Sequence, residues 1–296
     1  MRESGMNTKP NWQRVSKRNP CPVCQKPDFC TRAGNFVHCM RVPSNRPQKD
    51  GMGWIHRLDE SLAIPPMPEK KERPRRSDEE LDRCFRRMAD KWFDGAGEKR
   101  AELAKSLGVA LRTMEALRVG WNGATWTIPE YSAKGLTLGI GTRAPDGSKK
   151  FVLGGRRGLV FQPESILAQG PMLIVEGPSD VAACLTMGLC VVGRPSNNGG
   201  AAILVDLLRE YQGPLIVLGE NDVKEDGRWP GKEGAEAVRA AMCRRLHRRI
   251  EIRYPLDGAK DLRNWLLQWK VDPEKSSACR KLGASFIRRL GVGTRA

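Results

Sequence analysis

The sequence predicts an α/β protein with a cysteine-rich N-terminal module, a small basic α+β segment, and a domain built on a parallel β-sheet. Two observations lead to this prediction. From residue 171 onward, apolar runs typical of buried strands alternate with helical segments, which is the order that produces parallel strands. Near the N-terminus, four of the nine cysteines lie between residues 19 and 41, in a segment too short to fold on an apolar core alone.

The clustered cysteines have the spacing of a metal site. Cys21 and Cys24 form a Cys-x2-Cys pair, and Cys30 and Cys39 complete a set of four thiolates. A tetrahedral Zn²⁺ ion held by four thiolates supplies folding energy that so small a segment lacks. We therefore expect a zinc ribbon with one structural zinc ion. In an alternative ligand set, His38 replaces Cys30 or Cys39.

Between this module and the parallel sheet the pattern changes twice. Residues 57–76 contain four prolines and little to bury, which predicts a linker. Ser77 and Glu80 then form a capping-box pattern at the start of a helix. Two further helices are expected near 97–107 and 110–117. They are expected to pack against each other rather than to bind a specific DNA sequence. A small antiparallel sheet is expected over 124–161. The expected boundaries are 1–56 zinc ribbon, 57–76 linker, 77–168 helical and basic β subdomain, 169–273 parallel-sheet domain and 274–296 C-terminal tail.

The charge of the chain indicates the class of its partner. The formal net charge is +17, and such an excess of Lys and Arg favours a polyanion such as nucleic acid. No apolar run approaches the ~20 residues that a membrane-spanning helix needs, and no apolar core of a signal peptide is present. We expect a cytoplasmic protein with no membrane partner. Thiols stay reduced there, which favours metal binding over disulfides.

Carboxylates follow three strands of the predicted parallel sheet. Glu176 follows the run "MLIV", Glu220 and Asp222 follow "PLIVL", and Asp261 follows "IEIRYPL". Because the carboxyl ends of parallel strands meet at one edge of a sheet, these side chains are expected to lie close together. Hard divalent cations relieve the repulsion between clustered carboxylates, so the pattern predicts Mg²⁺ or Mn²⁺. The role of Asp180 stays open between this cluster and a charge in the first turn of a helix.

At these residues the chain resembles a known family. The stretches "IVEGPSDVAACL", "VLGENDVKEDGRWPGKEGAEAV" and "GAKDLRNWL" are similar to the three acidic motifs of the Toprim domain of bacterial and phage primases, topoisomerases and some nucleases. The preceding stretch, residues 127–161, resembles the small basic subdomain that comes before Toprim in primases. The N-terminal zinc ribbon completes the order of domains in a primase, and the resemblance covers almost the whole chain.

The resemblance implies roles for the acidic residues. Glu176 matches the glutamate of the first motif, which acts in metal binding or acid–base chemistry. Glu220 and Asp222 match the Asp-x-Asp pair that holds the metals, and Asp261 matches the acid of the Lys-Asp motif. The glutamate at position 220 departs from the family pattern, and so does an apparent insertion at 223–230, "VKEDGRWP".

Two sets of basic residues are expected to contact nucleic acid or nucleotide. By the resemblance, the nucleotide or template is bound by Arg143, Lys149 and Lys150. Because they lie close by in the sequence, Arg156 and Arg157 are expected to bind with them. In the zinc ribbon, aromatic residues alternate with arginines, a composition suited to stacking on unpaired bases while contacting the backbone. The aromatic residues are Trp12, Phe29, Phe36 and Trp54, of which Phe36 is expected in the core of the ribbon.

The predicted function is that of a DNA primase, which synthesises short RNA primers on single-stranded DNA by metal-dependent nucleotidyl transfer. Its expected partners are single-stranded DNA, nucleoside triphosphates and a separate replicative helicase, because the chain contains no phosphate-binding loop of a helicase motor. Two alternatives remain: a non-catalytic replication factor that binds single-stranded DNA, and a Toprim nuclease. A topoisomerase would need a large separate domain carrying an active-site tyrosine.

Overall fold

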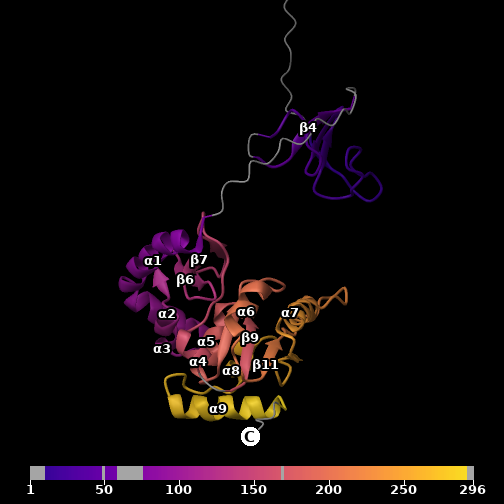
Figure 1. Cartoon of the computed structure of the whole chain (residues 1–296). Helices are drawn as coiled ribbons and strands as arrows, with labels where there is room; N and C mark the ends of the chain where they lie inside the picture. Colours follow the sequence, from indigo (N-terminus) through magenta and orange to yellow (C-terminus); the bar gives the residue numbers. More distant parts are fainter. Residues whose placement is uncertain (1–10, 49–50, 59–75, 168–169, 292–296) are drawn as a thin grey trace, which may run out of the picture. The chain divides into compact units, whose positions relative to one another are not determined.

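A computed structural model of the chain describes residues 11–48, 51–58, 76–167 and 170–291 (Figure 1). The chain divides into two compact units, Met1–Arg75 and Arg76–Ala296, each of which is described by itself. Most of the predicted linker lies outside the described residues. None of the helices within the described ranges has the length and apolar content needed to cross a bilayer.

The N-terminal unit is a small antiparallel sheet around a cluster of cysteines. Its strands, in spatial order, are β1 (Gln13–Arg14), β2 (Thr31–Ala33), β3 (Phe36–Cys39) and β4 (Trp54–Arg57). Along β3 the side chains alternate between the two faces of the sheet, so Val37 and Cys39 are fully buried. Phe36 points the other way and is 41% exposed, stacked against Arg57. The expectation that Phe36 belongs to the core was therefore wrong.

The C-terminal unit begins with three helices and a second antiparallel sheet. These are α1 (Asp78–Asp94), α2 (Gly97–Leu107), α3 (Leu111–Ala116), β5 (Gly120–Trp121), β6 (Trp126–Tyr131), β7 (Thr137–Arg143) and β8 (Lys149–Phe151). The capping box at Ser77 and Glu80 is present, and α1 packs on β7 through Phe85 and Ile140. Leu103 of α2 and Met114 of α3 are buried, so these helices pack together as expected.

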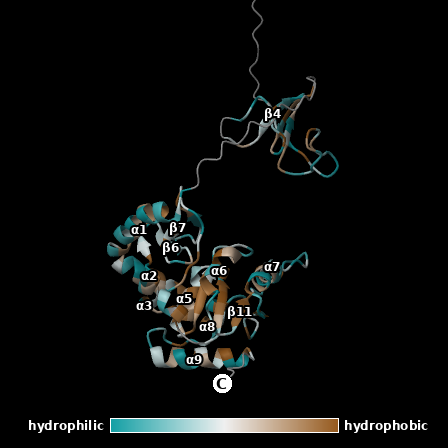
Figure 2. Ribbon diagram, viewed as in Figure 1, coloured by the Kyte–Doolittle hydropathy of each residue, from teal (hydrophilic) through white to brown (hydrophobic). Residues whose placement is uncertain are grey.

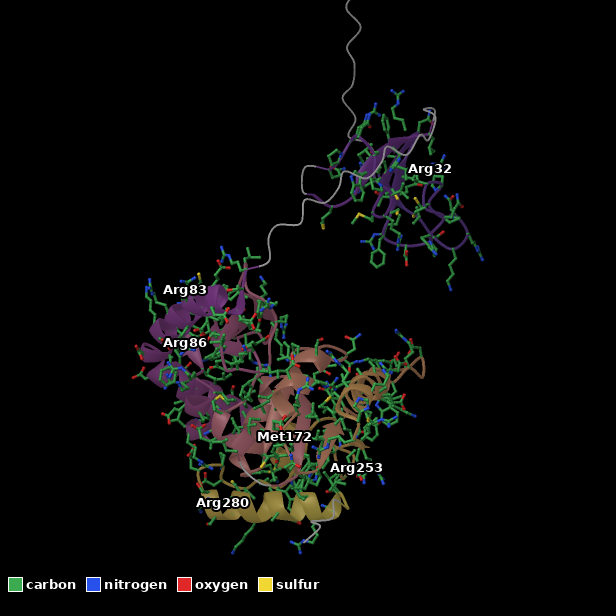
Figure 3. All side chains as sticks on the ribbon, in the orientation of Figure 1. Arg32, Arg83, Arg86, Met172, Arg253 and Arg280 are labelled. Atoms are coloured by element: carbon green, nitrogen blue, oxygen red, sulfur yellow. The ribbon has the colours of Figure 1, made fainter. Side chains whose placement is uncertain are left out.

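The second half of this unit is the parallel sheet. Its strands, in spatial order, are β10 (Val191–Arg194), β9 (Met172–Glu176), β11 (Leu215–Leu218) and β12 (Glu251–Arg253), and every pair is parallel. The α/β class and the succession of an antiparallel cysteine-bearing sheet and a parallel sheet are thereby confirmed. Met172, the first residue of the inner strand β9, is fully buried (Figure 3), and hydrophobic residues concentrate in this sheet (Figure 2).

Helices cover both faces of the parallel sheet. They are α4 (Pro163–Leu167), α5 (Pro178–Thr186), α6 (Ala201–Leu208), α7 (Pro230–Leu246), α8 (Leu262–Gln268) and α9 (Ser276–Arg289). One apolar cluster joins the sheet to α5, α8 and α9, and a second joins it to α6 and α7. The sequence analysis expected a tail after residue 274, but α9 occupies it and buries Leu282 and Phe286 in the first cluster.

Most cysteines of the C-terminal unit pack as small apolar residues. Cys184 and Cys279 are buried, and Cys190 and Cys243 are partly buried. Cys84 is exposed, because its position on α1 lies away from the stripe of Leu81 and Phe85 that packs on β7.

The capping box supports a prediction about stability. The Ser77 hydroxyl accepts a hydrogen bond from the Glu80 amide at 3.2 Å, and the Glu80 carboxylate accepts one from the Ser77 amide at 2.9 Å. Replacing Ser77 with Ala removes the first bond and should lower the free energy of unfolding by about 1 kcal/mol. Urea unfolding followed by circular dichroism measures this, with Ser277→Ala, at an exposed position of α9, as the control. Equal stability of the two variants would contradict the prediction.

Candidate functional site

The four clustered cysteines form a potential metal site. The sulfur atoms of Cys21, Cys24, Cys30 and Cys39 all lie within 4.8 Å of one another. The Cys24 and Cys30 sulfurs are 3.7 Å apart, and the Cys30 and Cys39 sulfurs are 4.0 Å apart. Four sulfurs around zinc, at the usual Zn–S distance, would be about 3.8 Å apart. The donor set and its spacing therefore fit a tetrahedral zinc ion.

His38 does not belong to this group. Its Nε2 atom lies 2.6 Å from the carbonyl oxygen of Met52, so the ring is engaged elsewhere. Burial opposes ionisation of Cys24, but a hydrogen bond from the Lys26 amide and bonds from neighbouring groups lower the pKa of its thiol to about 7. Burial raises the pKa of the Cys30 thiol to about 12. The cluster thus contains one thiol that ionises readily and another that would need a bound cation to do so.

The predicted carboxylates lie at one edge of the parallel sheet. Glu176 ends β9, Glu220 and Asp222 follow β11, and Asp261 follows β12 as the N-cap of α8. Burial raises the pKa of Glu176, and the charge of Asp222 contributes. Burial also raises the pKa of Glu220, with a contribution from Glu176. These carboxylates are therefore close enough to disfavour one another's ionised form.

Most of these carboxylates already have a partner within the protein. Glu176 pairs with Arg194 at 3.6 Å. One oxygen of Asp222 accepts a hydrogen bond from the Gly231 amide at 2.7 Å, and the other lies 3.8 Å from the Lys224 ammonium. Asp261 accepts from the amide of Asn264 at 2.7 Å. In the described part of the chain, the Glu220 side chain alone of the four has no hydrogen-bond or ion-pair partner, while its backbone carbonyl accepts a hydrogen bond from Trp229 Nε1 at 2.7 Å.

As a result, the acidic edge is more open than the thiolate cluster. Over the described ranges, the cysteines are the only group of three or more potential ligands whose donor atoms all lie within 4.8 Å of one another. Carboxylate oxygens are the donors that Mg²⁺ and Mn²⁺ prefer. The chemistry of the edge therefore fits a divalent ion, although its donors do not converge as the thiolates do.

Asp180 lies behind this edge rather than at the surface of its helix. It is 4% exposed, and one of its oxygens accepts a hydrogen bond from the Arg263 amide at 3.0 Å, which connects α5 to the first turn of α8. Burial, with a contribution from Asp261, raises the pKa of Asp180 to about 8. Asp180 lies in the first turn of α5, as the helix-start alternative expected, but it is buried there.

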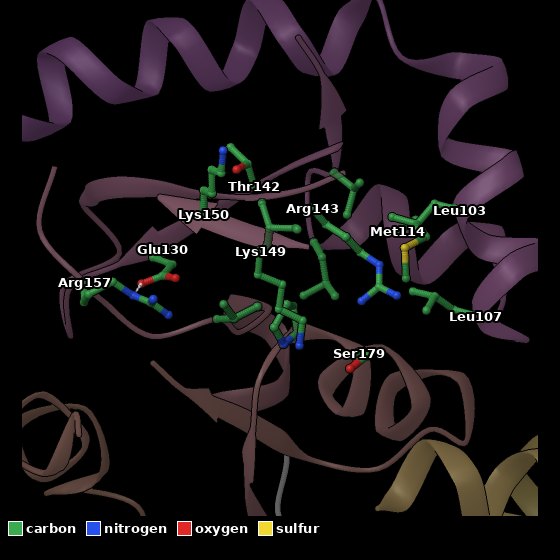
Figure 4. Close-up of a pocket in the computed structure, with 16 residues that line it drawn as sticks. Leu103, Leu107, Met114, Glu130, Thr142, Arg143, Lys149, Lys150, Arg157 and Ser179 are labelled. Atoms are coloured by element: carbon green, nitrogen blue, oxygen red, sulfur yellow. Dashed lines mark hydrogen bonds and ion pairs between the residues drawn. The ribbon is translucent and has the colours of Figure 1, made fainter. Parts of the chain in front are cut away.

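A pocket opens beside the acidic edge (Figure 4). Its apolar floor comes from α2, α3 and β6, and Arg143 and Lys149 border it together with Ser179 in the first turn of α5. Lys149 extends toward Ser179, and its charge acts on Glu176. Lys150 follows it on the same strand and also lines the pocket, but its side chain leaves the strand in the opposite direction (Figure 4). The two neighbouring lysines are thus not equivalent.

The remaining two basic residues of the predicted set are held by the fold. Arg157 pairs with Glu130 at 2.9 Å and donates to the Pro195 carbonyl at 2.5 Å, which joins the antiparallel sheet to the loop after β10. Arg156 pairs with Asp78 at the start of α1 and does not border the pocket.

Comparison with solved structures identifies the same architecture in primases. The zinc-binding and RNA polymerase domains of the Aquifex aeolicus primase match with a TM-score of 0.51 at 16% identity, over 70% of this chain and 62% of that one, less than two thirds of its length. This chain has a primase-type fold. The E. coli primase catalytic core matches with a TM-score of 0.49 at 15% identity, over 71% of this chain and 83% of that one. The primase fragment of the bacteriophage T7 primase-helicase matches with a TM-score of 0.40 at 15% identity, over 59% of this chain and 72% of that one. No family model and no curated protein matches the sequence.

Three residues that shape the site of this primase-type fold were missed by the sequence analysis. Arg194 faces Glu176, Glu130 fixes Arg157, and Asn221 donates from its side chain to the Ala259 carbonyl at 2.7 Å. Asn221 thereby fastens the Glu220–Asp222 segment to the chain that precedes Asp261. The stretch "CVVGR" could have indicated Arg194, because it places a charged residue at the end of an apolar strand, as in the three acidic motifs.

The thiolate geometry leads to a prediction about metal content. The purified chain should carry about one zinc ion, and Cys30→Ser should lose most of it because the ion is left with three sulfur ligands. Inductively coupled plasma mass spectrometry measures the zinc content. Cys84→Ser, which removes an exposed thiol outside the cluster, and His38→Ala should both retain the metal. Retained zinc in Cys30→Ser, together with loss in His38→Ala, would assign the site to the histidine instead.

Proposed function

We propose that this chain is a DNA primase that makes short RNA primers on single-stranded DNA by metal-dependent nucleotidyl transfer. The observation that carries the proposal is the juxtaposition of the acidic edge with the basic pocket: the Lys149 charge acts on Glu176 at the end of β9. A nucleoside triphosphate needs cations for its phosphates and carboxylates to hold a metal ion beside them. Both surfaces lie in the same compact unit.

In this proposal the acidic edge holds Mg²⁺ or Mn²⁺ through Glu220 and Asp222, with Glu176 and Asp261 beside them. A divalent ion there would lower the pKa of a primer 3′-hydroxyl and neutralise charge on the α-phosphate. The Glu220 carboxylate can bind the ion without losing any side-chain contact described in the structure. Asp222 keeps its bond from Gly231 through one oxygen, and its other oxygen is released when the half-exposed Lys224 moves away.

The basic pocket would bind the incoming nucleotide. Arg143 and Lys149 are the side chains suited to its phosphates, and the apolar floor from α2 and α3 is suited to the face of a base. Because Glu130 and Asp78 already hold Arg157 and Arg156, we assign these two arginines to fixing the loop between β8 and the parallel sheet. Lys150 is assigned to the surrounding positive surface.

The N-terminal unit would bind the template around a zinc ion held by its four cysteines. Phe29 and Trp12 are 77% and 38% exposed, and the guanidinium of Arg41 lies 5.5 Å from the centre of the Phe29 ring. Exposed rings that alternate with arginines can stack on unpaired bases while the cations contact the phosphates. A replicative helicase is proposed as a separate partner.

One observation favours a second function. The carboxylates do not converge into a group of three within the described residues, which suits a non-catalytic replication factor that binds single-stranded DNA. Incubation with a single-stranded template, labelled nucleoside triphosphates and Mg²⁺ separates the classes. RNA primers support the primase, cleaved DNA indicates a nuclease, and binding alone indicates the replication factor.

Asp222 provides the sharpest mutational test. The substitution Asp222→Asn retains an oxygen for the Gly231 amide but removes a charged metal ligand, so primer synthesis should fall at least 100-fold, an order of magnitude typical for a misplaced reacting group. Stability should hold or rise, because like charges at the edge are reduced. Labelled-primer gels and urea unfolding measure the two effects. Glu220→Asp, which restores the usual residue of the resembling family, is the control and should stay active. Full activity of the Asp222→Asn variant would rule out the proposed metal site.

The two lysines of β8 form a matched pair. Lys149→Ala should raise the KM for nucleoside triphosphate about tenfold, since a charge-assisted contact to phosphate contributes roughly 1.5–3 kcal/mol. Lys150→Ala removes the same charge from the next residue, which lines the pocket but whose side chain does not extend toward Ser179, and should change the KM less than about threefold, a difference of roughly 0.6 kcal/mol. Steady-state kinetics on one template give both values. Similar effects from the two substitutions would reduce the role of Lys149 to that of general positive charge.

A further inference from the structure

Arg194 has a position that ordinary packing does not explain. It ends β10, and the register of the parallel pair sets it opposite Glu176. Side-chain alternation directs it to the same side as Val192, toward the apolar cluster formed with α6 and α7. The side chain has no exposed surface. A full positive charge thus lies inside the protein, at the inner side of the acidic edge.

The guanidinium of Arg194 has no hydrogen bonds within the described part of the chain. Nε, Nη1 and Nη2 are all buried without such a partner, and the one close opposite charge is Glu176, with 3.6 Å between Nη2 and Oε2. A guanidinium carries five N–H donors, and burying it is unfavourable unless a nearby negative charge compensates. Burial lowers the pKa of Arg194, and the charges of Glu176 and Glu220 oppose that change. The guanidinium stays charged when buried, so the acidic edge supplies its compensating negative charge.

Two protein cations contact the acidic edge in different ways. Lys224 lies 3.8 Å from Asp222, and its side chain is 53% exposed, so it can exchange for a metal ion by moving into solvent. Arg194 has no such route, because its side chain is enclosed. A divalent ion bound to Glu176 would lie within a few ångströms of the guanidinium, where the repulsion between the two cations is strong at low dielectric constant.

We propose that Arg194 is a fixed internal cation that takes the place of a second divalent ion, so that the acidic edge binds one Mg²⁺ or Mn²⁺ ion through Glu220 and Asp222. This inference rests on the metal site of the proposed function and specifies its stoichiometry. Arg194 neutralises Glu176 and thereby acts as a positioning residue. The openness of the carboxylate cluster follows, because one of its members is already paired with a cation.

The test counts Mn²⁺ ions on the zinc-loaded full-length chain by equilibrium dialysis, with the free ion followed by electron paramagnetic resonance. The wild-type protein should bind one Mn²⁺ per chain. Arg194→Met keeps the length of the side chain but removes its charge, and should bind two because Glu176 becomes available. Arg194→Lys retains the buried cation and should bind one. The double variant Arg194→Met with Glu176→Gln removes both charges and should also bind one.

The outcomes separate this inference from the function on which it rests. Two Mn²⁺ ions on the wild-type chain, or one on a folded Arg194→Met variant, would overturn the role of Arg194 and leave the metal site standing. No Mn²⁺ on the wild-type chain would overturn both. If Arg194→Met does not fold, the wild-type count decides alone: one ion supports the inference and two ions refute it.

Discussion

The C-terminal unit depends on one physical constraint. Carboxylates gather at one edge of its parallel sheet, and their negative charge must be neutralised there. Parallel strands bring their carboxyl ends together, so β9, β11 and β12 necessarily gather Glu176, Glu220 and Asp261. Each charge needs a partner in this half-buried setting. The chain supplies a different one for two of them: a buried arginine for Glu176 and the first-turn amide of α8 for Asp261. Within the described residues the Glu220 side chain has none, and burial raises its pKa.

The antiparallel sheet β5–β8 connects to the parallel sheet through a buried carboxylate, that of Glu130. Glu130 on β6 is 3% exposed, and it accepts hydrogen bonds from Arg157 and from the Gly158 amide. The same arginine donates to Pro195, directly after Arg194. Arg157 therefore links β6, through its ion pair with Glu130, to the loop after β10, through its hydrogen bond to Pro195. A backbone bridge between Val160 and Gly193 joins the same two parts of the unit.

Much of the fold could be predicted from local pattern. The strands of the parallel sheet are continuous apolar runs because both of their faces are buried, and the capping box at Ser77 is a property of four consecutive residues. The order of the acidic residues followed from the same pattern. What could not be predicted were partners distant in sequence, such as Glu130 with Arg157 and Asp180 with Arg263. Phe36 was misassigned because hydrophobicity does not reveal which face of a short strand is inside.

The thiolate cluster and the acidic edge differ for a physical reason. In the N-terminal unit, Cys21, Cys30 and Cys39 form most of the buried core together with Val37. Packing that core therefore also brings the potential metal ligands together. Neutral thiols tolerate this proximity, and zinc can replace their protons without rearranging the chain. Carboxylates cannot approach one another in the same way, because they remain charged and repel. Arg194 and Lys224 each pair with one of these carboxylates, and within the described residues the acidic edge stays more open than the thiolate cluster.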